Sequence, residues 1–207
     1  MHKIASKKEI MSIEELQKWQ EVIYAVTRGR LSSVQAREEM RRYLERTGYT
    51  PDPGLEGTIR DRSSVEGMKH IIDTNVAMAR GWAQRQEMLG DVLSPGQELY
   101  RQRNSRVPRN WTQRWQDAAE AVGWEGVARG GQMIALVTSP IWVELSAFDN
   151  PYPPFDYNSG MRVRPVDFEV CEELGLVSLD DIDALEEEMQ AQKRILSPPV
   201  LMLGEYD

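Results

Sequence analysis

Hydrophobic residues recur at steps of three and four along the first 90 positions of the sequence, which is the spacing of the inward face of an α-helix. Three predicted helices cover residues 12–29, 32–48 and 63–89. Each begins with a serine that is followed three residues later by Glu or Gln, the spacing of a capping box. Gly67 and Gly81 each weaken the longest helix by about 1 kcal/mol relative to alanine, so tertiary packing must hold it.

The rest of the sequence carries shorter apolar stretches. Strands are predicted at residues 98–102, at the continuous apolar run 133–137, and at 161–166, where apolar residues alternate with arginines. Short helices are predicted over residues 110–122, 139–145, 167–175 and 178–189. The predicted fold class is α+β, with a mainly helical N-terminal part followed by a small domain of a short antiparallel sheet and helices. The predicted divisions are a helical region at 1–57, a domain at 58–192 and a tail at 193–207.

Residues 151–166, PYPPFDYNSGMRVRPV, predict a structured loop that turns into the third strand. Its prolines fix φ angles and remove amide donors, which excludes a helix or a central strand. The Asp, Asn and Gly residues that follow supply turn chemistry. A loop with three aromatic residues is expected to be pinned onto a core, and a free contact surface is the alternative. The aromatic residues are Tyr152, Phe155 and Tyr157.

Charge is distributed unevenly along the 207 residues. The net charge of −8 argues against a protein that coats nucleic acid over its whole surface. Residues 167–192 hold ten acids and no Lys or Arg, whereas residues 101–114 hold five arginines and no acid. The five arginines are Arg101, Arg103, Arg106, Arg109 and Arg114.

This arginine segment is the main candidate for a contact surface. Its guanidinium groups are interleaved with Tyr100, Trp111 and Trp115, a combination suited to phosphates or stacked bases. The same arginines can instead pair with an acidic protein surface, including the acidic C-terminal helix of this chain. We favour protein or intramolecular pairing, because tryptophans four residues apart on a helix more often face a core.

Catalytic and metal-binding sets are not expected. A single cysteine excludes an internal disulfide, and two histidines leave little for a His-based triad or a zinc site. Cys171 is interpreted as a small buried hydrophobe, although His70 offers a conceivable base. The acids at 180–183 fit a helix N-terminus better than a cation site, and the glycines at 123–131 fit a turn into a strand better than a phosphate cradle.

No apolar run approaches the roughly 20 residues of a membrane span. We therefore expect a soluble, intracellular protein with no cofactor, no membrane contact and no small-molecule substrate.

Residues 152–163 resemble a signature near the C-terminus of the phage Mu F-like minor head proteins, a family that includes the SPP1-type head morphogenesis proteins. The family typically reads H-P-P-N-G-Y-N-C-R-C-R-V, and this chain reads YPPFDYNSGMRV. The motif residues expected to have structural roles are Pro153, Pro154, Tyr157, Asn158, Gly160 and Arg162.

A second stretch, IIDTNV at residues 71–76, is similar to the family's helix segment I-x-R-T-N/E-V, which is followed by a small residue and a glycine. Thr74 and Asn75 carry this match, with Gly81 after them. The two segments stand in the family's order, so the resemblance covers about residues 60–176 and places the predicted domain at 58–192 in this family.

The chain departs from the family pattern at four positions. Ser159 and Met161 stand where the family has cysteines, so any metal or disulfide role of that pair cannot apply here. Tyr152 stands in place of the histidine, and Asp73 in place of a usual arginine.

The resemblance implies a non-enzymatic virion component of a phage or prophage. Such a protein binds the portal vertex with other head proteins and acts in capsid assembly, DNA packaging or DNA ejection. It is found in the bacterial host cytoplasm during assembly and then in the virion head. The alternatives are an enzyme or effector carried on a Mu F-like module, or a protein that binds double-stranded DNA through the arginines of residues 101–114.

Overall fold

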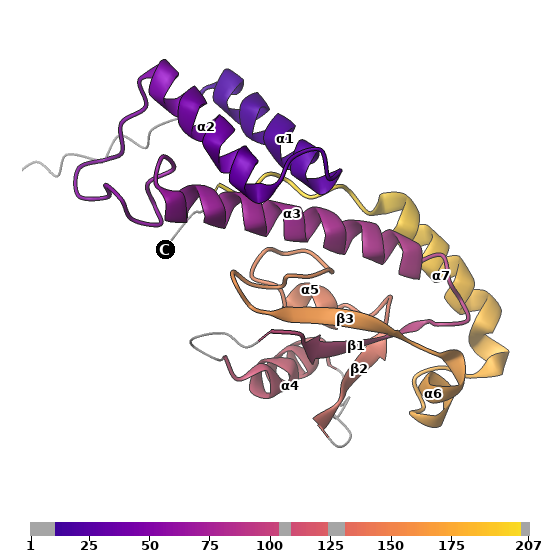
Figure 1. Ribbon diagram of the computed structural model, residues 1–207. Coiled ribbons are helices and arrows are strands. Elements are labelled where there is room, and N and C mark those ends of the chain that lie inside the picture. Colours follow the sequence, from indigo (N-terminus) through magenta and orange to yellow (C-terminus); the bar gives the residue numbers. More distant parts are fainter. Residues whose placement is uncertain (1–10, 104–108, 124–130, 204–207) are drawn as a thin grey trace, which may run out of the picture. The chain divides into compact units, whose positions relative to one another are not determined.

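The computed structural model describes residues 11–103, 109–123 and 131–203. Within these ranges it contains seven α-helices and one three-stranded sheet, so the predicted α+β class is confirmed (Figure 1). The helices are α1 (Ile13–Thr27), α2 (Ser33–Thr47), α3 (Val65–Met88), α4 (Trp111–Ala121), α5 (Ile141–Glu144), α6 (Phe168–Glu173) and α7 (Ile182–Ile195). The strands are β1 (Gly96–Arg101), β2 (Met133–Leu136) and β3 (Met161–Val166).

The chain forms two compact units. Unit 1 comprises Met1–Val76 together with Leu201–Asp207, and unit 2 comprises Ala77–Val200. The division falls inside α3, whereas the predicted boundary at 57/58 lies within unit 1. Unit 1 is therefore assembled from two separate segments of the chain, and unit 2 is inserted between them.

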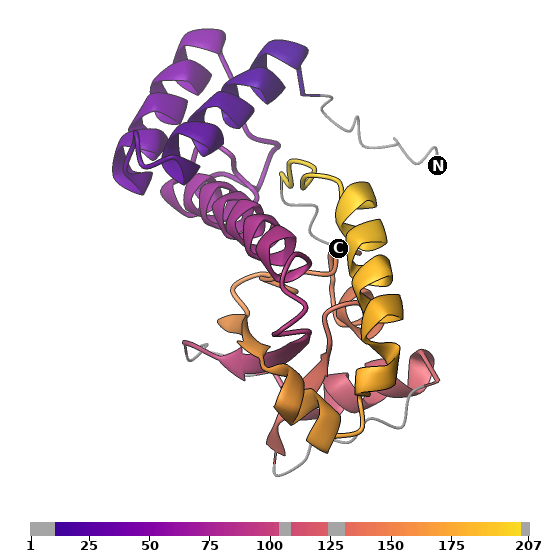
Figure 2. The same cartoon turned by 90° about the vertical axis from the view of Figure 1, so that its right-hand side faces the viewer.

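In unit 1, α1 and α2 lie side by side (Figure 2). Their buried side chains form one apolar cluster with the first half of α3, and the largest members include Trp19, Met40 and Ile72. The hydrophobic spacing predicts Ile13, Leu16, Ile23 and Val26 on the inward face of α1. In the structure Ile13 is exposed, and Trp19 is fully buried. Trp19 donates from Nε1 to the Glu15 carboxylate at 3.3 Å, so this buried indole is satisfied within the helix.

Serine caps start the helices of unit 1. Ser32 forms the complete predicted capping box with Gln35, and Ser12 accepts from the Glu15 amide at 3.1 Å. At α3 the predicted cap is displaced by one residue, since Ser64 accepts from the Gly67 amide at 2.9 Å. Ser63 instead donates to the Asp61 carboxylate at 2.6 Å, because that buried acceptor offers a stronger, charge-assisted bond.

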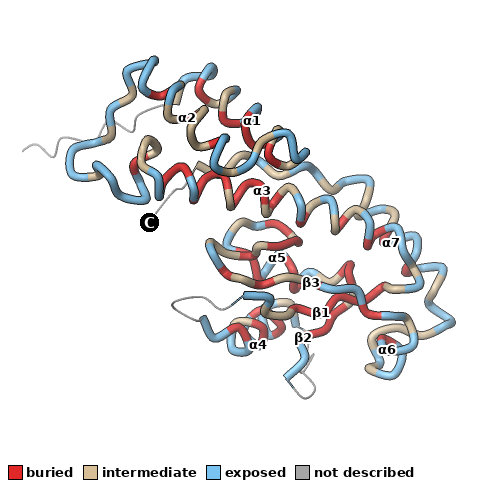
Figure 3. The backbone as a smooth tube through the Cα atoms, viewed as in Figure 1, coloured by how far each residue is buried: buried red, intermediate tan, exposed pale blue. Residues whose placement is uncertain are grey.

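Unit 2 is built on the antiparallel sheet, whose strand order is β2-β1-β3. Leu99 of the central strand pairs with Met133 on one side and Val163 on the other, and all three point to one face. That face packs against a cluster that includes Trp111, Trp115, Trp142 and Phe155. The core therefore lies on this side of the sheet, and β1 is buried along most of its length (Figure 3).

The opposite face of the sheet is covered at one end by α6. Cys171 is fully buried there with Ile134 and Val166. A Cβ atom at Gly96 would lie 2.4 Å from the Cys171 Sγ, so only glycine at this position of β1 admits the helix so closely.

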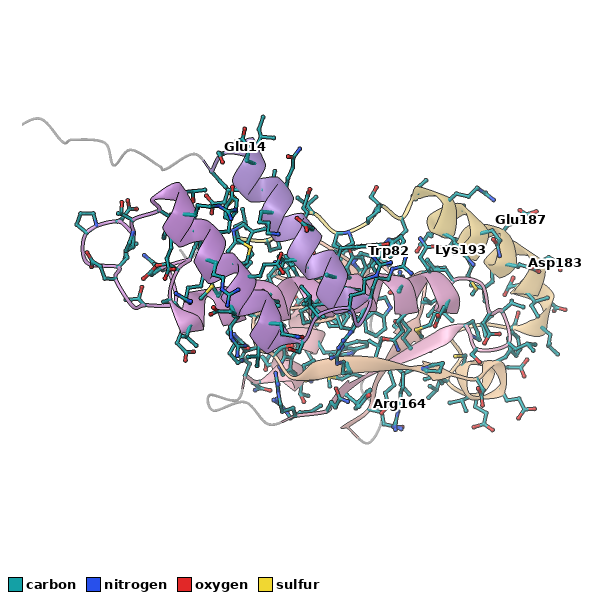
Figure 4. All side chains as sticks on the ribbon, turned by 45° about the horizontal axis from the view of Figure 1, so that its top comes forward. Glu14, Trp82, Arg164, Asp183, Glu187 and Lys193 are labelled. Carbon is teal, nitrogen blue, oxygen red and sulfur yellow. The ribbon has the colours of Figure 1, made fainter. Side chains whose placement is uncertain are left out.

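The predicted acidic helix is α7. Leu185 and Met189 face the core as predicted, and acids occupy its exposed side. Figure 4 shows Asp183 and Glu187 projecting outward from this helix.

Candidate basic interface

The arginine segment runs from the end of β1 to the first turn of α4, both in unit 2. Asn110 caps α4 as predicted, by accepting from the Gln113 amide at 3.1 Å. This cap fixes where Arg114 leaves the helix. Arg106 lies outside the described residues.

Residues 151–160 form the loop before β3, and we call them the motif loop because they carry most of the signature at 152–163. Asp156 of this loop is the partner of two predicted contact residues. Its Oδ2 atom lies 2.8 Å from Nη1 of Arg114 and 3.1 Å from Nε of Arg109. The carboxylate side chain is only 15% exposed, whereas the two arginine side chains are 29% and 39% exposed. Arg109 and Arg114 thus pair with this loop, and in the described part of the chain no arginine of the segment pairs with the acidic C-terminal helix.

Gly160 joins the loop to the arginine segment a second time. Its carbonyl accepts from the amides of Gln102 at 2.9 Å and Arg103 at 3.3 Å. Gly160 has a φ of 68°, and an added Cβ would lie 2.2 Å from the Arg103 carbonyl oxygen. Glycine is required here both by the backbone conformation and by the close approach.

Strand β3, which pairs with β1, carries two further arginines on the face of the sheet opposite to Val163. Arg162 donates from Nε to the Gln102 amide oxygen at 3.0 Å. Arg164 forms an ion pair with Glu98 at 2.5 Å, and its guanidinium lies over the Tyr100 ring at 5.6 Å from the centroid. Figure 4 shows Arg164 projecting from β3.

We call this group of residues, whose members lie on both faces of the sheet, the basic interface and define it by its charged residues. The described cations are Arg101, Arg103, Arg109, Arg114, Arg162 and Arg164, and the carboxylates are Asp156 and Glu98. Six positive groups against two negative ones leave a net charge of +4 on a protein of net charge −8. Arg101, Arg103 and Arg162 form no ion pair among the described residues. Because Arg101 donates to the Arg109 carbonyl at 3.2 Å, the charges of Arg103 and Arg162 are the ones that we consider open to an external anion.

The two tryptophans of the arginine segment belong to the core. Trp111 is 3% exposed and Trp115 is fully buried, so neither offers a face on which a base can stack. Trp111 contributes to the interface by a cation–π contact, because the Arg114 guanidinium carbon lies 4.9 Å from the centroid of its ring. The basic interface is therefore an array of guanidinium groups more than an aromatic platform.

The motif loop is pinned to the core, as its aromatic residues predicted. Tyr152 and Phe155 are buried, and Phe155 stacks on Trp142 with ring centroids 6.0 Å apart. Tyr157 packs edge-on against Phe148 at 4.7 Å. The Pro153-Pro154 peptide bond is cis. These contacts fix the loop on the core of unit 2, and the loop in turn fixes the positions of Asp156 and Gly160.

Ser159, which stands where the Mu F-like signature has a cysteine, forms hydrogen bonds within the loop. Its hydroxyl donates to the Pro154 carbonyl at 2.5 Å and accepts from the Met161 amide at 3.2 Å. Asn158 adopts the left-handed conformation, with a φ of 49°, which asparagine tolerates better than most residues. The loop is thus closed by oxygen acceptors without sulfur.

Two residues of α3 that the sequence did not assign to this loop help to position it. Gly81 of α3 lies against it, since an added Cβ would be 2.2 Å from the Pro153 carbonyl oxygen. Arg85, one helical turn further, is buried and donates to the Pro151 carbonyl at 3.1 Å and to the Gln192 side chain at 3.3 Å. Burial lowers the pKa of Arg85 to about 9. An arginine near a helix end usually faces solvent, so only the fold reveals this role.

The second motif segment lies in unit 1, apart from the basic interface. Thr74 and Asn75 are both buried in α3. The Asn75 side chain bonds the backbone of Met202, which belongs to the second segment of the same unit. The residues of the first predicted motif therefore belong to unit 2, and those of the second belong to unit 1.

Groups considered for chemistry are placed as follows. Burial, and secondarily the nearby Asp167 charge, raises the pKa of the Cys171 thiol to about 11, which disfavours the nucleophilic thiolate. His70 lies in unit 1 and Cys171 in unit 2. In the described parts of the chain, no three His, Cys, Asp or Glu residues are grouped to hold a metal ion. The glycine segment at 123–131 falls largely outside the described residues.

Comparisons with protein-family models, with curated proteins and with solved structures find no match to this chain. The resemblance to Mu F-like proteins therefore stays a prediction from the sequence. No helix among the described residues is long and apolar enough to cross a membrane.

Proposed function

We propose that this protein is a non-enzymatic minor head protein of the Mu F-like type that binds the portal vertex through its basic interface. The observation that supports the proposal is the contact between the motif loop and the arginine segment. The motif loop supplies Asp156 and Gly160, and these residues position the arginine segment beside it. The residues of the resemblance thus hold a charged contact surface in place.

The chemistry of the interface favours an acidic partner. A partly exposed array of guanidinium groups provides planar donors for the carboxylates of a protein surface or for phosphates. Arg109 and Arg114 share the single negative charge of Asp156, so the loop also lowers the positive charge that is available to a partner. We assign Arg103 and Arg162 to partner contact, and Arg109 and Arg114 chiefly to holding the loop.

The test uses the full chain and a purified portal oligomer of the phage or prophage that encodes it. Arg103→Gln with Arg162→Gln should weaken co-purification at least tenfold and leave the melting temperature unchanged, because neither side chain is ion-paired among the described residues. Arg28→Gln with Arg30→Gln is the matched control, since these exposed arginines lie in unit 1. Equal binding by both double variants would refute the proposed surface.

Duplex DNA is the second candidate partner, and the local charge of +4 is the observation that favours it. Binding to a random-sequence duplex should then weaken steeply with added salt. Replacing Arg103 and Arg162 should reduce the slope of log affinity against log salt by about 2, one for each phosphate that is no longer neutralised. Affinity that does not change with salt would exclude DNA as the partner of this interface.

A further inference from the structure

Unit 1 holds Met202, in the C-terminal part of the chain, by its backbone. Asn75 donates from Nδ2 to the Met202 carbonyl at 2.6 Å and accepts from the Met202 amide at 2.7 Å. The same Nδ2 also donates to the Ile71 carbonyl at 2.7 Å, which fixes the orientation of the amide within α3. One side chain thus satisfies both polar groups of one residue, much as a neighbouring strand would. Such a contact does not depend on the side chain at position 202.

The residues on either side of Met202 supply apolar contacts. Leu201 and Leu203 are partly buried against the core cluster of unit 1, which includes Met68, Ile72 and Val76. Unit 1 therefore accepts a segment in which a leucine stands on each side of a residue that is held by its backbone. We call residues 201–203 the returning segment and their position on unit 1 the segment site.

The returning segment is connected to α7 by a linker that makes few contacts. The Leu196 carbonyl accepts from Nε1 of Trp82 at 3.4 Å, but residues 197–200 form no hydrogen bond within the described chain. Val200 is 81% exposed. Residues 198 and 199 are both proline, which makes the linker semi-rigid. A short hinge that cannot relax favours exchange of the segment that it carries.

We propose that the segment site accepts the returning segment of a second copy of this chain, so that two copies associate by exchanging residues 201–203. A second copy supplies the same backbone at Met202 and the same two leucines, so every contact in the site is reproduced without new chemistry. The exchange needs only the linker at 197–200 to take another direction. Swapping of an identical element is a low-cost route to a dimer.

The exchange is tested by mixing two full-length variants, one with a damaged segment site and the other with a damaged returning segment. Asn75→Asp keeps the returning segment but replaces the amide donor with a carboxylate that repels the Met202 carbonyl. Leu201→Asp with Leu203→Asp keeps the segment site but removes the apolar contacts. Each variant alone should have the mass of one chain by light scattering, and the mixture should form a 1:1 complex of about twice that mass.

Two controls make the result specific to the segment. Val200→Asp added to the Asn75→Asp chain should leave the complex intact, because Val200 is exposed. Leu203→Asp added to the same chain should abolish the complex. In a parallel measurement, a fluorescent peptide of residues 197–203 should bind the chain that carries Leu201→Asp and Leu203→Asp, and a peptide with the same two changes should not.

A 1:1 complex with the expected control pattern supports exchange between copies. Peptide binding without any mixed complex would overturn it, because the site would then accept the segment but not from a second chain. A chain that unfolds when Leu201 and Leu203 are replaced would also overturn it, since the returning segment would then be an integral part of the unit. The interface arginines are untouched in every variant, so these outcomes are independent of the test with the portal oligomer.

Discussion

The helix ends of unit 1 and the motif loop of unit 2 are held by contacts of very different range. In unit 1 the helix caps join residues three apart, as in Ser32 with Gln35 and Ser64 with Gly67. In unit 2 the polar contacts that position the motif loop join residues far apart in the sequence: Arg114 is 42 residues from Asp156, and Arg85 is 107 residues from Gln192. Local signals thus specify much of unit 1, whereas the basic interface exists only when unit 2 is packed.

This difference has a functional consequence. The positions of the Arg109 and Arg114 guanidinium groups are determined by a loop that is itself held by Phe155 and Gly81. Damage to the core of unit 2 should therefore remove partner binding, while damage to unit 1 should leave it intact. The following predictions test this separation.

Removal of one core tryptophan from each unit should have the largest effect. Trp19→Ala and Trp142→Ala each delete a fully buried side chain and should each cost about 4 kcal/mol of unfolding free energy. Hydrogen exchange resolved by segment should quicken in α1 and α2 for the first variant, and in β1 and β3 for the second. Equal loss of protection throughout both variants would mean that the units unfold as one.

Two glycines with similar backbone conformations separate local strain from tertiary contact. Gly160 has a φ of 68° and faces the Arg103 carbonyl, whereas Gly48 has a φ of 74° and open space around it. Gly160→Ala should cost about 3 kcal/mol, and Gly48→Ala about 1 kcal/mol, by chemical denaturation. Similar costs for the two would show that the loop moves away from Arg103 without penalty.

Asp61 of unit 1 should make stability depend on pH. Burial alone would raise the pKa of this carboxyl, but hydrogen bonds from the Ser63 hydroxyl and from the Gly57 and Ser63 amides lower it below the ordinary value. The stabilisation is therefore present above the unfolded pKa of about 4 and is lost as the pH falls through the folded pKa. Asp61→Asn should cost about 2 kcal/mol at neutral pH and progressively less in acid.

The control for this experiment is Asp52→Asn, an exposed aspartate of the same unit. Its unfolding free energy should follow that of the unchanged protein at every pH. A constant difference between Asp61→Asn and the unchanged protein from pH 7 to acid would exclude the carboxylate as the source of the stabilisation.

Helix caps should give the smallest effects and the clearest contrast between the units. Ser32→Ala removes a complete capping box and should cost about 1 kcal/mol. Ser139→Ala in unit 2 should cost less than about 0.5 kcal/mol, because its hydroxyl accepts from the Ile141 amide only at 3.4 Å and α5 is short. Equal costs would contradict the greater dependence of unit 1 on local signals.

The sequence by itself determined the α+β class, the three strands and the caps at Ser12, Ser32 and Asn110. These features depend on residues one to four positions apart, so their spacing is visible in the chain. It also predicted that the aromatic loop is pinned, because side chains of that size are rarely left in water.

Only the tertiary structure decided which groups meet. The pairing of Arg109 and Arg114 with Asp156, the burial of Arg85, and the hold of Asn75 on Met202 all join distant segments. No local pattern selects a partner among the many acids and carbonyls of the chain. That choice follows from packing, which brings particular groups together and leaves each buried donor few acceptors within reach.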